Sequence, residues 1–143
     1  FYLSLIKNYH NVSSVSNQTY ALLKQSTAAL VTSGTATLET ALFGIPEVVC
    51  YKGNEISYQI AKRLVNIKYI SLVNLIMDKE VVKELIQHEM NTEQLTAELK
   101  KILPGGVQRE QVLNDYQQLK ALLSADGDAS AKAAKLIHDF VSK

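Results

Sequence analysis

The stretch from residue 28 to residue 51 constrains the fold most strongly, because it holds two short apolar runs with one amphipathic run between them. Residues 28–31 and 48–51 have the length and side chains of buried strands. Residues 35–43 carry apolar side chains at helical spacing, and a Gly-Ile-Pro stop follows them. Two strands joined through a helix run parallel. The sequence therefore predicts an α/β fold, with a parallel sheet flanked by helices.

The turn between the first predicted strand and the helix is a candidate anion site. In open α/β sheets this turn lies at the carboxyl edge, where ligands bind. Ser33, Gly34 and Thr35 offer backbone N–H groups, two hydroxyls and the positive end of a helix dipole, which together suit a phosphate. Glu39 follows about 6 Å further along the same helix face. We therefore predict that the turn binds a diphosphate and that Glu39 accepts hydrogen bonds from a ribose.

A purely structural explanation of these residues stays open. Thr is a good N-cap residue and Gly bends freely, while the stretch contains neither a GxGxxG fingerprint nor a Walker loop. A carboxylate near the start of a helix is also favoured by the dipole, by about 0.3 to 1 kcal/mol. However, a capping box on Thr35 would need the acid at the position of Leu38. That spacing favours a ligand role for Glu39.

Several runs of the chain occur in the same order in one enzyme family. They are S-G-T-A-T-L-E-T-A-L-F-G-I-P-E-V-V-C-Y (33–51), I-A-K-R-L-V (60–65), Y-I-S-L (69–72), N-L-I (74–76) and E-V-V-K-E-L-I-Q (80–87). On these runs the chain resembles the lipid-A-disaccharide synthases, from about residue 18 to its end. The resemblance implies an inverting glycosyltransferase of the GT-B type, which has two Rossmann-like domains.

The resemblance also implies a substrate pair and a role for this chain. Members of the family join UDP-2,3-diacylglucosamine to 2,3-diacylglucosamine 1-phosphate and release UDP, in a scheme that requires no metal or other cofactor. The nucleotide binds mainly to the C-terminal domain. Residues 1–103 would then form a truncated Rossmann-like UDP-sugar-binding domain. Residues 104–143 would be helices that pack back toward the N-terminal domain in the full enzyme.

We expect the chain to be a partial C-terminal GT-B domain. A first residue of Phe1, in place of Met, points the same way as the resemblance. The resemblance places the general base, the acyl-chain pocket and the acceptor site in the N-terminal half, so the isolated chain should be inactive. Some apolar surface of the terminal helices should then be exposed or covered by another copy, as in a homo-oligomer.

A polar turn at residues 52–55 follows the second predicted strand, and its place is the same carboxyl edge of the sheet. Lys52 can therefore reach a diphosphate that is bound at Thr35. The alternative is a solvated loop lysine without a ligand.

Asn74 and Glu80 match the family motif that follows residues 69–72, which we predict to be a strand with residues 73–79 as a loop at the ligand edge. An Asn side chain offers donors and an acceptor to a sugar or base. The resemblance implies that Asn74 contributes to catalysis or donor binding and that Glu80 contributes to substrate binding. The family commonly has Gly-Arg-Glu before the next element. Here Lys79 replaces the arginine, which keeps the charge but loses the bidentate fork.

Apolar spacing, caps and stop residues predict the remaining elements. We expect a brief strand over 12–15 and helices over 2–9, 17–25, 56–65, 80–87, 91–102, 107–124 and 130–141. Within 80–87, Glu84 and Gln87 should lie on the solvated side. The buried set of the last helix should be Ala133, Ala134, Ile137 and Val141.

The composition argues against several other functions. The chain has 15 basic and 14 acidic residues and no basic stripe, which gives no case for binding nucleic acid. A single Cys50 within an apolar run builds neither a disulfide framework nor a metal cluster. We find no signal peptide and no run of about 18 apolar residues, so we expect a cytoplasmic protein. The resemblance adds peripheral contact with the inner face of the inner membrane in the full enzyme.

Two other functions stay open. Another UDP-sugar enzyme, such as a UDP-N-acetylglucosamine epimerase or a different GT-B transferase, would share the Gly-Thr and Glu features. It should lack the Ser-Leu-Val-Asn-Leu run at 71–75 and the Glu-Val-Val-Lys-Glu-Leu run at 80–85. A non-catalytic α/β interaction module would show no response to nucleotides.

Overall fold

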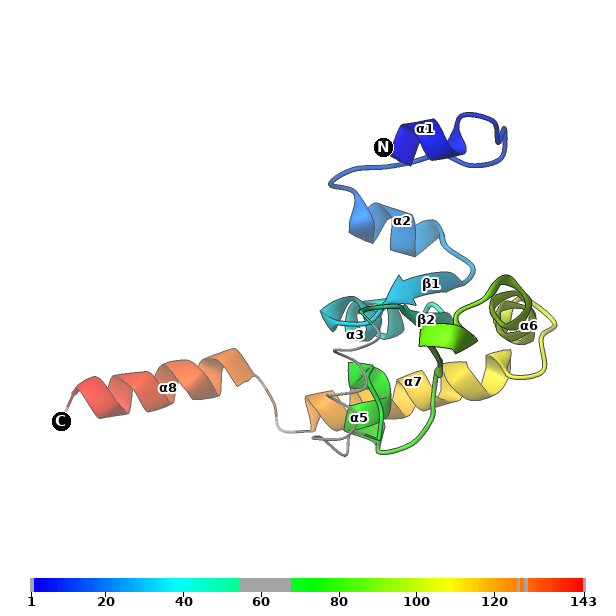
Figure 1. The fold of residues 1–143 in the computed structure, drawn as a ribbon. Coiled ribbons are helices and arrows are strands. Elements are labelled where there is room, and N and C mark those ends of the chain that lie inside the picture. Colours follow the sequence, from blue (N-terminus) through cyan, green and yellow to red (C-terminus); the bar gives the residue numbers. More distant parts are fainter. Residues whose placement is uncertain (1, 55–67, 126, 128, 143) are drawn as a thin grey trace.

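The computed structural model confirms the α/β fold, with a parallel sheet flanked by helices (Figure 1). It describes residues 2–54, 68–125, 127 and 129–142. The described sheet has the strand order β1 (Ala29–Thr32), β2 (Glu47–Tyr51), β3 (Lys83–Ile86), and both neighbouring pairs are parallel. This arrangement is consistent with a Rossmann-like GT-B domain.

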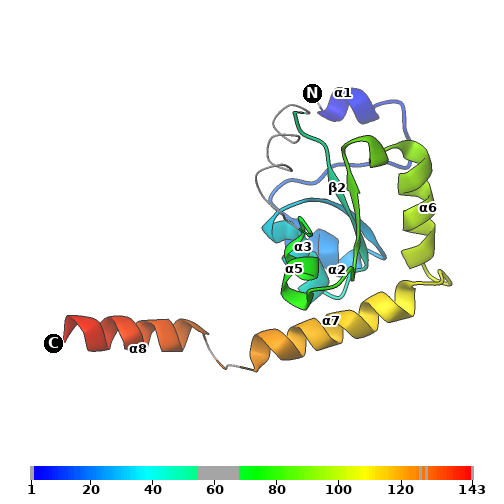
Figure 2. The same cartoon turned by 60° about the horizontal axis from the view of Figure 1, so that its bottom comes forward.

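Helices cover both faces of the sheet (Figure 2). The described helices are α1 (Tyr2–Ile6), α2 (Thr19–Gln25), α3 (Thr35–Leu42), α5 (Leu72–Met77), α6 (Thr92–Ile102), α7 (Arg109–Ser124) and α8 (Ala129–Val141), with a 3-10 turn, η1 (Gln87–Glu89), after β3. Helix α6 packs on one face, against β2 and β3, while α3 and α5 lie together on the other. Helix α7 runs across the amino ends of the strands and contacts α3, α5 and α6.

The first β-α-β unit forms as predicted, with strand bounds shifted by one residue. The register pairs Val31 of β1 with Val49 of β2. Helix α3 ends at Leu42, and Gly44 takes a φ of +76°, which L side chains rarely adopt. The N–H of Gly44 donates to the carbonyl oxygen of Ala41 (2.9 Å), which closes the last turn. The Gly-Ile-Pro stop therefore works as the sequence predicts.

One hydrophobic cluster joins the sheet to its covering helices. Its buried members are Ala41, Val48, Val49, Val73, Val81, Val82, Leu85, Ile102, Val112, Tyr116 and Leu119. The last three of these recur at helical spacing along α7, in the range where we predicted a helix. Helix α7 therefore shares the core of the sheet.

The strand predicted over 69–72 is wrong. Helix α5 begins at Leu72 and continues to Met77, where we expected a loop. Ser71 is its N-cap residue, and the Ser71 Oγ accepts a hydrogen bond from the backbone N–H of Asn74 (3.3 Å). A side-chain cap followed by an apolar run favours a helix over a strand.

The helix predicted over 80–87 is also wrong, because Lys83–Ile86 form β3. A short apolar run fits both a helix and a buried strand, and periodicity alone does not separate them. Pairing with β2 decides the outcome, since Glu84 lies in register with Val49. The strand predicted over 12–15 is wrong as well, because no strand forms there. The helix predicted over 56–65 lies outside the described residues.

Helix α8 projects away from the rest of the chain in both ribbon views. The buried set predicted for it is wrong, because Ile137 is 65% exposed, Val141 is 77% exposed, and Ala133 and Ala134 are exposed too. The pattern correctly gives α8 an apolar face, but α8 extends away from the helices and strands that form the hydrophobic core. Within the described ranges, no helix is both long enough and apolar enough to cross a bilayer.

Candidate functional site

The carboxyl ends of the strands bring three polar segments to one edge of the sheet. Because both strand pairs are parallel, the residues that follow β1, β2 and β3 lie at the same edge. These segments begin with Ser33, Lys52 and Gln87. The sequence predicted the first two as site residues, whereas Gln87 is an addition from the structure.

The turn after β1 leaves the first amides of α3 open. Gly34 is the N-cap residue, and no side chain of a described residue caps this helix. Gly34 has a φ of +141°, which L side chains rarely adopt, so the turn requires glycine. Thr35 is exposed, and the first N–H groups of a helix have no partner within it. Open amides and the positive end of the dipole make this turn suitable for an anion.

The Ser33 side chain is engaged within the chain. Its Oγ donates a hydrogen bond to the carbonyl oxygen of Ile70 (3.2 Å). A hydroxyl has one proton to donate, so Ser33 Oγ does not donate to a phosphate while this bond is made. Ser33 therefore offers its backbone N–H to an anion, and its side chain ties the turn to the segment before α5.

A buried carboxyl group holds that segment in place. Glu84 on β3 is only 8% exposed, and its two oxygens accept hydrogen bonds from the backbone N–H groups of Ile70 and Ser71, each at 2.9 Å. Its Oε1 also accepts one from Asn74 Nδ2 (2.9 Å). The expectation that Glu84 is solvated is therefore wrong, because a strand rather than a helix turns its side chain toward α5.

The Asn74 side chain is also fully engaged within the chain. It is completely buried, and its Nδ2 donates a second hydrogen bond to the carbonyl oxygen of Val82 (2.8 Å). Its Oδ1 accepts hydrogen bonds from the N–H groups of Val81 (2.8 Å) and Val82 (3.0 Å). These bonds use both donors and both acceptor positions of the amide. Asn74 thus reaches the candidate site only through Glu84 and the segment that Glu84 holds.

Glu39 borders a hollow between α3 and the start of α2. The hollow has a volume of about 580 Å³. Its lining residues are Asn17, Gln18, Thr19, Tyr20, Ala21 and Glu39. The Tyr20 ring stacks on Phe43 with ring centres 5.3 Å apart, which holds α2 against α3. Glu39 is half-buried, and within the described part of the chain no hydrogen bond or ion pair engages its carboxylate. Its oxygens are therefore available to a ligand.

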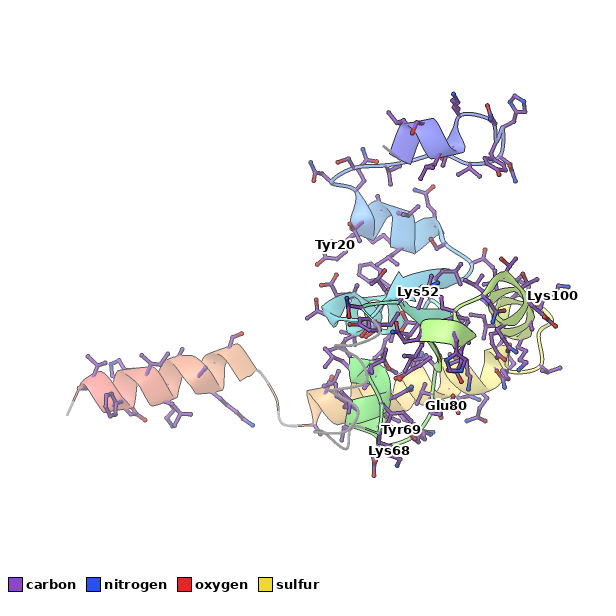
Figure 3. All side chains as sticks on the ribbon, in the orientation of Figure 1. Tyr20, Lys52, Lys68, Tyr69, Glu80 and Lys100 are labelled. Carbon is purple, nitrogen blue, oxygen red and sulfur yellow. The ribbon has the colours of Figure 1, made fainter. Side chains whose placement is uncertain are left out.

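Lys52 is exposed at the end of β2 (Figure 3). The next residue, Gly53, is bound to Gln87: the Gly53 N–H donates to Gln87 Oε1 (2.7 Å), and Gln87 Nε2 donates to the Gly53 carbonyl oxygen (3.3 Å). The expectation that Gln87 is solvated is wrong, because its exposure is 4%. A strand predicted to end at Ile86 would have placed Gln87 at the carboxyl edge of the sheet. The helix that we predicted over 80–87 gave no reason to place it there.

Glu80 lies apart from Lys52 in Figure 3, below it in this view. It precedes β3, so it belongs to the amino edge of the parallel sheet, and its Oε1 accepts a hydrogen bond from Lys83 Nζ (2.9 Å). The neighbouring Lys79 pairs with Asp115 on α7 (2.7 Å). Both side chains therefore form their ion pairs at the amino edge of the sheet, and the structure does not bring them to the start of α3.

The most strongly perturbed carboxyl group also lies at the amino edge. Glu47 opens β2 and is 1% exposed, and no described residue forms a hydrogen bond with its carboxyl oxygens or with Tyr116 Oη. Burial raises the pKa of Glu47 from 4.5 to about 9, so the carboxyl group is protonated at neutral pH. Burial, with the nearby Glu47, also raises the pKa of Tyr116. Glu47 and Tyr116 are therefore expected to affect the stability of the fold rather than the binding of a ligand.

The site as a whole defines a class of protein. An open parallel α/β sheet carries an uncapped helix start at its carboxyl edge, with an available carboxylate one turn further on. This combination is typical of domains that bind phosphorylated ligands. In the described residues, no group of three or more His, Cys, Asp or Glu side chains is placed to hold a metal ion.

Comparison with known proteins gives the family. The model of the family described as lipid-A-disaccharide synthetase matches residues 2–138. The lipid-A-disaccharide synthase of Psychromonas ingrahamii is 44% identical over 117 residues, which is 82% of this chain and 30% of that protein. That of Syntrophus aciditrophicus is 38% identical over 125 residues, 87% of this chain and 32% of the relative. That of Acidobacterium capsulatum is 36% identical over 124 residues, 86% of this chain and 31% of the relative.

The chain belongs to the lipid-A-disaccharide synthase family. This confirms the resemblance drawn from the motifs between residues 33 and 87. The chain spans about a third of the length of the curated relatives that it matches.

Proposed function

We propose that this chain is the donor-binding part of a lipid-A-disaccharide synthase, a glycosyltransferase of lipid A biosynthesis. The donor is UDP-2,3-diacylglucosamine, the acceptor is 2,3-diacylglucosamine 1-phosphate, and UDP is released. Family membership supports the activity. The open helix start at the carboxyl edge supports the donor-binding role. A second Rossmann-like domain of the full enzyme would supply the general base and the acceptor site.

In this proposal the diphosphate of UDP binds at the start of α3. The N–H groups of Ser33, Gly34 and Thr35 and the helix dipole stabilise the negative charge that grows on UDP as the sugar departs. A Cβ added at Gly34 would meet no atom of the described residues within 4 Å, so the described part of the chain leaves space for a phosphate beside this turn. Lys52 at the neighbouring strand end adds a positive charge to the same edge.

Glu39 binds the ribose in the same arrangement. It stands one helical turn beyond Thr35, about 6 Å along the axis, which is the reach from a bound phosphate to its sugar. Its carboxylate oxygens accept hydrogen bonds from the ribose hydroxyls. The hollow beside it, at about 580 Å³, falls within the range of small-molecule sites. This placement of Glu39 is the observation that carries the proposal.

Asn74 serves the donor site indirectly. Its amide binds Glu84, Glu84 holds the backbone of Ile70, and the Ile70 carbonyl oxygen accepts the hydrogen bond from Ser33. Removing the Asn74 amide would therefore loosen the phosphate turn without removing a ligand contact. Because Glu80 lies at the amino edge, we leave it outside the donor site.

Replacing Glu39 with Ala tests the proposal. A hydrogen bond to a charged group contributes about 1.5 to 3 kcal/mol, so UDP should bind about tenfold or more weakly to the variant. Isothermal titration of the chain with UDP measures the dissociation constant. Glu93→Ala removes an exposed carboxylate from α6 and should leave that constant unchanged.

Two outcomes of this titration would argue against the proposal. Equal affinity of Glu39→Ala and the wild-type chain for UDP would remove the ribose role. Absence of UDP binding to the wild-type chain would remove the donor-binding role and favour a non-catalytic interaction module.

A further inference from the structure

Gln87 has an unusual backbone conformation for its residue type. Its φ is +53°, in the left-handed region, and it is neither glycine nor an exposed loop residue. Such a conformation costs about 1 kcal/mol or more for an L residue and persists only where the surroundings hold it. It begins the turn directly after β3, at the carboxyl edge of the sheet. This conformation brings the side chain back toward β2.

The Gln87 amide continues the β2–β3 pairing beyond the last strand residues. The backbone register ends with Tyr51 opposite Ile86. Beyond that pair, the Gln87 side chain makes the hydrogen bonds that a strand backbone would otherwise make. Its Oε1 accepts from the Gly53 N–H (2.7 Å), and its Nε2 donates to the Gly53 carbonyl oxygen (3.3 Å). A single side chain therefore holds a segment that lies 34 residues away in sequence.

The segment held in this way carries Lys52. A Cβ added at Gly53 would lie 3.0 Å from Tyr51 Oη and 3.3 Å from Tyr51 Cζ, so the Tyr51 side chain lies against the backbone of Gly53. Lys52 stands directly between these two residues and is exposed. Its flexible stem has a limited length, so the position of the backbone at Lys52 decides whether the charge reaches a diphosphate at the start of α3. The bonds from Gln87 fix that position.

We propose that Gln87 is a positioning residue that fixes the segment at 52–54, so that the Lys52 charge stands beside a diphosphate bound at the start of α3. The inference rests on the proposed donor-binding function. A purely structural role of Gln87 would affect all ligands alike. The proposed role predicts that Gln87 affects the binding of the diphosphate alone, through Lys52. Gln87 need not touch the ligand.

Titration of the chain with UDP and with uridine tests the inference, because uridine lacks the diphosphate. Gln87→Ala removes both bonds to Gly53 and should weaken UDP binding about fivefold to tenfold, because the Lys52 charge is then no longer held beside the diphosphate. Uridine binding should stay unchanged. In a Lys52→Ala background, Gln87→Ala should have no further effect on UDP, because the two residues act in series.

Two further variants guard against trivial explanations. Gln87→Gly relieves the left-handed strain while it removes the amide, so it should fold and still lose UDP affinity. Gln117→Ala removes an exposed amide on α7 and should change neither ligand.

Three results would overturn the inference. The first is unchanged UDP affinity in Gln87→Gly, and the second is an equal loss of UDP and uridine affinity. The third is full additivity with Lys52→Ala. A wild-type chain that binds no UDP overturns the proposed function itself and, with it, this inference.

Discussion

Replacing Glu47 with Gln is expected to raise the free energy of unfolding, and the gain over the wild-type chain is expected to grow with pH. Burial raises the pKa of Glu47 from 4.5 in the unfolded chain to about 9 in the folded one. Between these values the folded state holds one more proton than the unfolded state, so stability falls as the pH rises. The favourable contribution is complete below about pH 4.5 and is lost on the way to about pH 9.

Denaturant unfolding, followed by circular dichroism at about pH 5 and about pH 8, measures this effect. The stability gap between Glu47→Gln and wild type should widen by up to about 1.4 kcal/mol per pH unit. Glu47→Met should behave in the same way without leaving a buried amide. Glu110→Gln removes an exposed carboxylate and should show no widening gap. A gap that stays constant with pH would mean that Glu47 titrates normally in the folded chain.

Replacing Glu84 with Ala is expected to destabilise the fold by about 3 kcal/mol or more. The substitution leaves the N–H groups of Ile70 and Ser71 without their acceptor, and Asn74 Nδ2 keeps only its bond to the Val82 carbonyl oxygen. Each unsatisfied buried donor costs about 1 to 3 kcal/mol. Because whole domains are stable by only about 5 to 15 kcal/mol, thermal unfolding should show a large fall in the midpoint.

Glu80→Ala is the matched control for this change. Glu80 lies in the same segment but is exposed, and its pair with Lys83 is a surface ion pair, worth about 1 kcal/mol or less. Similar losses of stability in Glu84→Ala and Glu80→Ala would contradict the buried network. A loss of stability in Glu84→Ala far below about 3 kcal/mol would also contradict the buried network.

The sequence predicts the first β-α-β unit well because its signals are local. Strand length, helical spacing and the stop at Gly44 all lie within the segment that they describe. For the same reason, the turn at Gly34 and the place of Glu39 on α3 follow from the pattern alone. A carboxylate four residues after Thr35 must lie on the same face of any helix that starts there.

The segment from 69 to 87 resists prediction because its signals are ambiguous and its contacts are distant. The run around Glu84 fits helical spacing and strand length equally, and only the pairing with β2 selects the strand. Once that run is taken as a helix, Glu84 and Gln87 fall on its polar side and look solvated. In the structure their partners come from α5 and from the segment after β2. Tertiary contacts therefore reverse the burial that a local pattern implies.

In helix α8 the sequence pattern implies burial, but the structure shows exposure. Its spacing marks an apolar face that contains Ile137 and Val141, but a pattern does not say what covers a face. Both side chains are exposed in the chain as described. Amphipathic spacing thus predicted the helix correctly and its burial wrongly.

The central claim is that the diphosphate of a UDP nucleotide binds to the amides at the start of α3. The most direct test is a two-dimensional amide NMR titration of the isotope-labelled chain with UDP and, separately, with uridine. UDP should shift the amide signals of Ser33, Gly34 and Thr35 strongly, whereas uridine should shift mainly those beside Glu39 and the start of α2. UDP shifts confined to the amino edge, around Glu80 and Lys83, or the absence of any shift at Gly34 and Thr35, would contradict the claim.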